Sequence, residues 1–154
     1  MPLITTTLND GLRRIFDEEY PSFEGFPQTL EEAVVRWGNV IDTYAGINLI
    51  PFSTTSQLAR TAFENTLLSL QPSNGALIIQ NAFLTYTVTI AQGMLPAFQG
   101  VPPPIPLNLI PIFGVGFAGG TSQEVASLLT TAIDTYFRTG TAINTQSGAT
   151  VNWN

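Results

Sequence analysis

Carboxylates are the only side chains of this 154-residue chain that could act as catalytic groups. The chain contains no His or Cys, and its five cationic residues are all Arg. This composition excludes a zinc site of the usual kind, a thiol nucleophile, a Ser–His pair and a lysine Schiff base. Any catalysis would therefore rest on Asp and Glu.

The acidic residues are not spaced for such chemistry. A glycosidase needs two carboxylates that face each other across a cleft, whereas the clustered glutamates fall at predicted helix ends and in a turn; they are Glu18, Glu19, Glu24, Glu31 and Glu32. The regular oxygen spacing of a calcium loop is missing. The glycine-rich segment 114–120 follows no predicted strand and precedes no Lys, so it does not predict a phosphate site. We predict that the protein is not an enzyme and has no catalytic residue, metal site or cofactor.

The charged residues are unevenly distributed along the chain. The net charge is −6, and five arginines on an acidic chain cannot form a basic surface for nucleic acid. No charged residue occurs between Asn65 and Gln123. This stretch forms either a Thr-rich surface that tolerates water or a surface that is buried against other subunits or a membrane, because the cores of interfaces are poor in charge.

Hydrophobic periodicity predicts a mainly α-helical fold, a bundle of about five helices. Three helices are expected to begin with a capping box, at Thr29, Thr54 and Thr121. Gly140 follows the last helix, in the position where glycine commonly ends one. The predicted helices cover about 3–19, 29–45, 54–70, 76–98 and 121–140.

The segment 76–98 fits two kinds of secondary structure. Apolar residues recur at helical spacing from Ile79 to Met94, and about 20 residues without an internal breaker favour a helix. Within it, however, the segment 84–90 alternates apolar residues with Thr, which is typical of a strand. The helix is the preferred interpretation, and the strand remains open.

Two apolar segments outside these helices are candidates for contact with other molecules. We expect a helical domain at 1–140, which includes a long Pro- and Gly-rich loop at 96–120, and a C-terminal β-hairpin or extended arm at 141–154. The loop either wraps the protein's own bundle or docks on a neighbouring subunit. The predicted interface residues are Ile105, Leu107, Leu109, Ile110, Ile112, Phe113 and Phe117 in the loop, and Ile143, Val151 and Trp153 in the arm.

Two stretches of the sequence resemble uncharacterised virion structural proteins of tailed bacteriophages. These are PPPIPLNLIPIFGVGFAGG at 102–120 and TAIDTYFRTGTAINTQSGATVNWN at 131–154, about the last third of the chain. The small acidic chain without Cys or His, with its Thr/Asn/Gly-rich end, is similar to such proteins as well. The resemblance implies a repeated subunit of a tail, baseplate, neck or capsid, and it transfers no functional residue.

We therefore expect a structural subunit of a symmetric assembly, joined to its neighbours through the apolar loop and the C-terminal arm. Its partners would be copies of itself and other structural proteins of the same particle, without nucleic acid or membrane. It would be found in the virion, assembled in the host cytoplasm, or otherwise in the cytoplasm. A membrane-active helical protein and a helical bundle that binds an apolar ligand are the alternatives.

Overall fold

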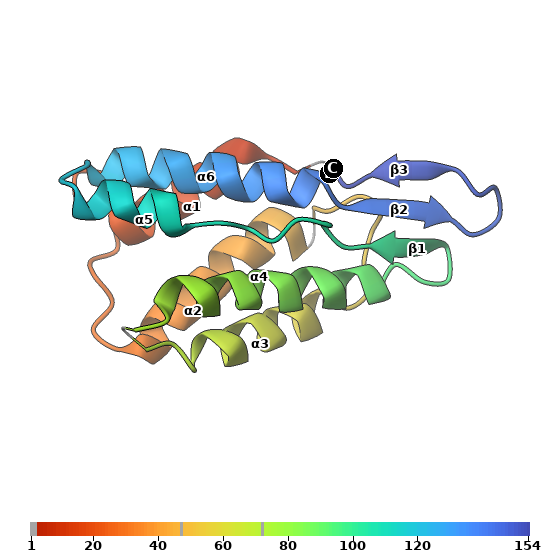
Figure 1. The fold of residues 1–154 in the computed structure, drawn as a ribbon, viewed down its shortest axis with the longest axis horizontal. Coiled ribbons are helices and arrows are strands. Elements are labelled where there is room, and N and C mark those ends of the chain that lie inside the picture. The colour runs from red at the N-terminus through yellow and green to blue at the C-terminus, as the bar shows by residue number, and fades with distance from the viewer. Residues whose placement is uncertain (1–2, 47, 72) are drawn as a thin grey trace.

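The structure is a computed structural model that describes residues 3–46, 48–71 and 73–154, without the side chains of residues 115–117. Within this part the chain forms six α-helices, one short π-helix and three strands (Figure 1). The elements are α1 (Thr5–Phe16), α2 (Leu30–Ile41), η1 (Asp42–Gly46), α3 (Ser56–Leu67), α4 (Gly75–Gln92), β1 (Phe98–Val101), α5 (Ile110–Phe117), α6 (Ser122–Arg138), β2 (Thr141–Asn144) and β3 (Thr150–Asn152).

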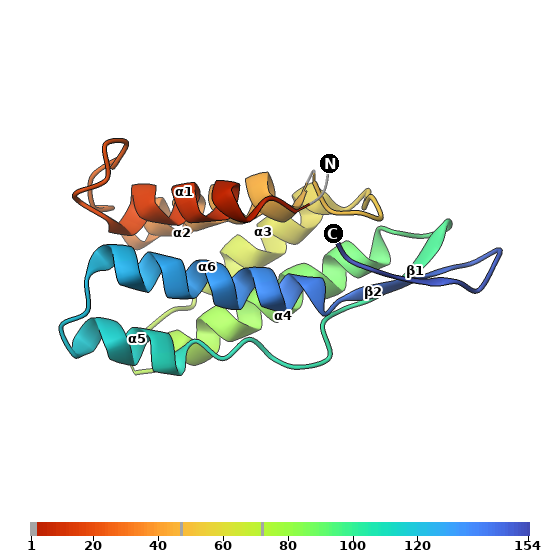
Figure 2. The ribbon, with the colours of Figure 1, turned by 90° about the horizontal axis from the view of Figure 1, so that it is seen from above.

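The helices pack as two neighbouring pairs with α2 between them. Helix α3 runs along α4, α1 runs along α6, and α2 contacts both α1 and α3 (Figures 1 and 2). Phe83 of α4 stands at the centre of the core, where its ring meets Trp37 of α2, Phe63 of α3 and two aromatic residues of α6 in edge-to-face contacts. Aromatic pairs of this geometry add to the stabilisation that comes from burial alone. One continuous core therefore joins the helices.

The small sheet extends from one end of the bundle (Figure 1). Its strands are antiparallel in the order β1–β2–β3, with Gly100 opposite Ala142 and Ala142 opposite Val151. Of the two alternatives for 141–154, a β-hairpin or an extended arm, the structure has the hairpin, formed by β2 and β3. It is joined to the helical part, because β2 pairs with β1 and Trp153 belongs to the common core cluster.

The mainly helical class is confirmed, but the five-helix bundle is not, because the loop at 96–120 contains two regular elements of its own. These are β1 and the additional helix α5. Between them the chain is extended and runs along the bundle between α4 and α6 (Figure 1). Leu107 and Leu109 are buried while Asn108 is exposed, so this stretch alternates like a half-buried strand. It packs on its own bundle, as the first of the two expectations for the loop predicts.

The segment that fitted both helix and strand is a helix, α4, as far as Gln92. Its threonines bond back to the carbonyls four residues earlier: Thr85 to Asn81, Thr87 to Phe83 and Thr89 to Thr85, at 2.9–3.0 Å. Such bonds place the β-branched Thr side chains inside a helix without leaving their hydroxyl groups unpaired. Length and core packing therefore outweigh the strand propensity of this sequence.

Two of the three predicted N-caps are confirmed. Thr29 and Thr121 accept hydrogen bonds from the backbone N–H groups of Glu32 and Glu124, each at 3.1 Å. The predicted cap at Thr54 is wrong, because α3 begins at Ser56 and no side chain caps it. The Thr54 hydroxyl instead donates to the Gly93 carbonyl at the end of α4, a partner that is distant in sequence.

Candidate functional site

Four of the ten predicted interface residues are covered by the protein's own chain. Leu107, Leu109, Ile112 and Trp153 are buried in the core cluster. Their predicted role as a docking surface does not fit this structure, because apolar area that the chain already covers is not available to a neighbour. The physical reason is that the stretch before α5, α5 itself and the residue that follows β3 all contribute side chains to the same core cluster as the other helices.

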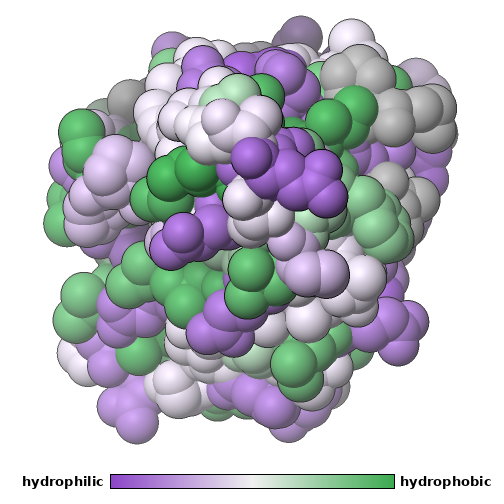
Figure 3. Space-filling model, turned by 90° about the vertical axis from the view of Figure 1, so that its right-hand side faces the viewer, coloured by the Kyte–Doolittle hydropathy of each residue, from purple (hydrophilic) through white to green (hydrophobic). Residues whose placement is uncertain are grey.

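The other predicted residues are more accessible. Ile105 and Ile110 are 72% and 63% exposed and Val151 is 39% exposed, whereas Phe113 and Ile143 are half-buried. The side chain of Phe117 lies outside the described part of the structure. Seen from the sheet end, green hydrophobic residues alternate with purple hydrophilic ones (Figure 3). On the face drawn there the hydrophobic residues are scattered among hydrophilic ones.

A longer apolar surface lies on α4, and the sequence analysis missed it as a site. The helix buries Phe83, Tyr86 and Ile90 on its inner side. On the opposite side it exposes a row that we call the α4 outer face: Leu77, Asn81, Leu84, Val88 and Gln92, continued by Leu95 just after the helix. The four apolar members are 57%, 43%, 37% and 56% exposed. A helix that is apolar on opposite sides is normally buried on both.

The α4 outer face lies within the charge-free stretch between Glu64 and Glu124. Its members recur every three or four residues, so they form one row along the helix. The sequence already contained this information in the absence of charge and in the leucines that fall outside the inner row. The α4 outer face was not predicted, because the alternation at 84–90 was interpreted as a strand pattern and not as a second apolar row on a helix.

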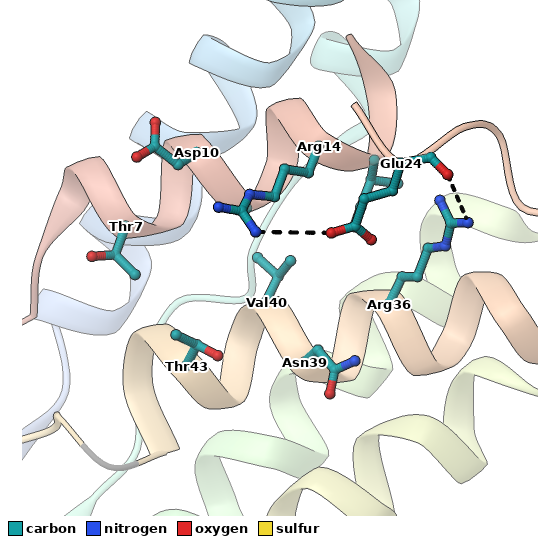
Figure 4. A pocket seen from close by; sticks show the side chains of 10 residues that line it. Thr7, Asp10, Arg14, Glu24, Arg36, Asn39, Val40 and Thr43 are labelled. Carbon is teal, nitrogen blue, oxygen red and sulfur yellow. Dashed lines mark hydrogen bonds and ion pairs between the residues drawn. The ribbon is translucent and has the colours of Figure 1, made fainter. Parts of the chain in front are cut away.

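A polar groove of about 300 Å³ lies between α1 and α2. Its charges are balanced: Arg14 points toward Glu24, with 3.8 Å between Nη1 and Oε1, and Arg36 donates to the backbone carbonyl of Glu24 (Figure 4). Asp10 accepts a hydrogen bond from the Tyr20 hydroxyl. Each charged group named here therefore has an ionic or hydrogen-bond partner in the structure.

A second polar cluster is buried between η1 and α4. The side-chain oxygens Asp42 Oδ1 and Tyr86 Oη have no hydrogen-bond partner among the described residues. Gly46 makes room for both, since a Cβ at that position would overlap Asp42 Oδ1 and come within 3.2 Å of the Tyr86 hydroxyl. Burial raises the pKa of Asp42, although Arg60 opposes the shift. An ordered water would satisfy such groups, and the cluster has the properties of a structural polar site.

Two findings concern metals and membranes. No group of three potential metal ligands occurs among the residues that the structure describes. Within the same residues, none of the helices is both long and apolar enough to cross a lipid bilayer.

In comparisons with known proteins, no family model, no curated protein and no solved structure matches the chain.

Proposed function

We propose that this protein is a structural subunit of a symmetric assembly, in which the α4 outer face is covered by another subunit. The observation that carries the proposal is the row of exposed apolar side chains on a helix without any charge. Apolar surface that leaves water on association contributes about 25 cal/mol per Å² before the ordering costs of binding. A monomer would leave this surface in water.

The loop and the arm have a smaller part in this proposal than the sequence alone indicates. Ile105, Ile110 and Val151 remain as accessible contacts, and the buried residues stabilise the subunit itself. A tailed-phage particle remains the proposed setting and rests on the resemblance of 102–120 and 131–154 to virion structural proteins. The proposal of an assembly stands on the α4 outer face and does not depend on that setting.

Light scattering behind a sizing column, on the full-length chain at low and high salt, tests the proposal. We expect a discrete oligomer at both salt concentrations, because apolar contacts are not screened by ions. Leu84→Glu, on the α4 outer face, should reduce the mass of the particle. Leu128→Glu, on α6, is the matched control, because Leu128 is exposed to a similar extent, 38% against 43%.

A chain that stays monomeric at both salt concentrations, at concentrations near 1 mM, would overturn the proposal, since even a weak specific dimer forms in that range. Co-sedimentation with liposomes separates it from a membrane-active protein. A structural subunit stays in the supernatant, whereas recovery in the liposome pellet that Leu84→Glu abolishes would replace the assembly with a membrane surface.

A further inference from the structure

The α4 outer face is nearly symmetric about its own midpoint. Leu77 and Leu95 lie equally far before and after Tyr86 in the sequence, and so do Leu84 and Val88. Tyr86 is fully buried. Leu77 lies about two and a half helical turns before it, on the side opposite its ring, and Leu95 lies exposed in the turn that follows the end of α4 at Gln92. The order of side chains along this face is therefore similar in both directions.

The polar residues of the α4 outer face are also arranged nearly symmetrically about its midpoint. Asn81 and Gln92 are both exposed and lie about three helical turns apart, so they stand on the same flank of the row. Reversing the direction of the helix exchanges their positions. A second α4, placed antiparallel across this face, would bring Leu77 against Leu95, Leu84 against Val88, and the Asn81 amide against the Gln92 amide.

The absence of charge favours this arrangement in particular. In a contact with two-fold symmetry, each patch meets its own copy, so a charge near the axis faces the same charge. Helix α4 has no charged residue, so nothing on it opposes such a contact. Side-chain amides can both donate and accept hydrogen bonds, and two of them can pair without burying an unsatisfied group.

The size of the face comes closer to that of a standard interface when its neighbour is included. Helix α4 has 18 residues and is about 27 Å long. Helix α3 packs beside it; Leu58 of α3 and Leu68 just after it are 60% and 44% exposed. Two helices of about 10 Å width present roughly 500 Å² in projection, and their side-chain relief adds accessible area. A standard interface buries about 800 Å² per partner.

We propose that a second copy of this chain docks on the α4 outer face, antiparallel to the first and related to it by a two-fold axis beside Leu84 and Val88. The inference rests on the proposed function, because it names the partner and the geometry of one contact within that assembly. It predicts specific residue pairs, and these pairs can be tested separately from assembly as such.

A charge-swap experiment tests the pairing of Leu77 with Leu95. Leu77→Glu and Leu95→Arg each place an unpaired charge in an apolar contact and should weaken the dimer at least about tenfold in light-scattering dilution series. In the double variant, each new carboxylate faces the new guanidinium of the other copy, and the dimer should return to within about threefold of the wild-type Kd. Both positions are more than half exposed, so the variants should fold.

The two substituted residues cannot rescue each other within one chain, because the helix from Leu77 to Gln92, about 22 Å long, separates Leu77 from Leu95. Rescue therefore requires an antiparallel copy. A double variant that binds no better than the weaker single variant overturns this inference, as does a wild-type affinity in both single variants. If the wild-type chain is oligomeric in those cases, the proposed assembly stands and only this contact is wrong; a monomeric wild-type chain overturns both.

Cross-linking gives a second test, for which the chain is well suited because it has no natural Cys. A mixture of the variants Asn81→Cys and Gln92→Cys should form a covalent dimer with a short bifunctional maleimide. Each variant alone should cross-link much less, because the antiparallel register places its two thiols far apart along the axis. Efficient cross-linking of Asn81→Cys with itself would indicate a parallel pair and overturn the inference.

Discussion

The indole of Trp153 lies directly against the backbone of Gly140. A Cβ added at Gly140 would overlap three atoms of the indole ring. The Trp153 backbone N–H donates to the Gly140 carbonyl and its indole N–H to the Thr141 carbonyl, each at 2.9 Å. Gly140 follows the last helix as the sequence predicts, since α6 ends at Arg138 with Thr139 as its C-cap, but Gly140 has no positive φ. Glycine is needed here because a large ring approaches the chain closely.

Gly140→Ala should destabilise the protein by about 1–3 kcal/mol, because the new methyl group enters space that a fully buried ring already fills. Urea unfolding followed by circular dichroism measures the change. Gly114→Ala in α5 is the control, since nothing lies within 4 Å of a Cβ there, and Ala is favoured over Gly inside a helix by about 0.5–1 kcal/mol. Equal effects of the two substitutions would show that the contact with Trp153 does not restrict Gly140.

Trp153→Ala should cost about 3–5 kcal/mol, the range for removing a large buried aromatic side chain. Val151→Ala, in the strand that Trp153 follows but 39% exposed, should change the free energy of unfolding by less than about 0.5 kcal/mol. Thermal and urea unfolding of both variants provide the comparison. If Trp153→Ala changed only the oligomer size and left stability intact, Trp153 would belong to an interface, as the sequence indicated, and not to the core.

Trp153 also illustrates what the sequence could and could not predict. The amphipathic helices and the caps at Thr29 and Thr121 depend on residues within one or two turns, and local patterns identify them. The indole of Trp153 lies against Gly140 and is hydrogen-bonded to Thr141, and the hydroxyl of Thr54 is hydrogen-bonded to Gly93, far along the chain. Partners that are distant in sequence leave no local pattern.

The same reasoning applies to the candidate site. A Pro-rich apolar segment predicts a surface that must be covered, but it does not tell whether the protein's own helices or a neighbour covers it. For Leu107 and Leu109 the cover is the bundle, whereas Ile105 is exposed. The outer face of α4 could have been found from sequence by testing each helix for a second apolar row, because charge was absent there as well.

Asp134→Asn should lower stability near pH 7 by about 1.5–3 kcal/mol, the range for a hydrogen bond to a charged group. The carboxylate accepts hydrogen bonds from the Tyr44 hydroxyl at 2.6 Å and from Arg138 Nε at 2.9 Å. Burial alone would raise the pKa of Asp134, but bonds from Arg138, Tyr44 and Thr5 outweigh it and hold the pKa below its usual value.

Because the folded-state pKa of Asp134 is depressed, the unfolded chain takes up the proton first as the pH falls. The stabilisation by Asp134 is thus complete above the unfolded value of about 4 and disappears as the pH falls through the folded value. Urea unfolding at pH 7 and pH 3 should show a smaller gap between wild type and Asp134→Asn at pH 3. Tyr44→Phe removes one hydrogen-bond donor to Asp134 and should also reduce the pH dependence of the free energy of unfolding. If the difference in stability between wild type and Asp134→Asn were the same at both pH values, the depressed pKa of Asp134 would be contradicted.

Asp42→Asn should have the opposite effect and raise the free energy of unfolding at neutral pH. Burial raises the pKa of Asp42, and Oδ1 has no hydrogen-bond partner among the described residues. The gain should be at most about 1 kcal/mol, because the carboxyl is only partly buried and solvent screens it. It should disappear below about pH 4, where the wild-type carboxyl is protonated in both states. A loss of stability at pH 7 would show that the ionised carboxylate has a partner, such as a bound water.

Leu109→Ala and Ile105→Ala distinguish the two roles that the apolar loop was expected to have. Leu109 is fully buried and Ile105 is 72% exposed, although the two lie four residues apart. Leu109→Ala should therefore cost about 2–5 kcal/mol in urea unfolding. Ile105→Ala should change stability by less than about 0.5 kcal/mol, and if the loop also contacts a neighbour it should reduce oligomer mass at unchanged stability. Stability and oligomer mass are measured on the same samples. A large loss of stability in Ile105→Ala would contradict the packing described for this stretch. A lower oligomer mass at unchanged stability would assign Ile105 to an interface.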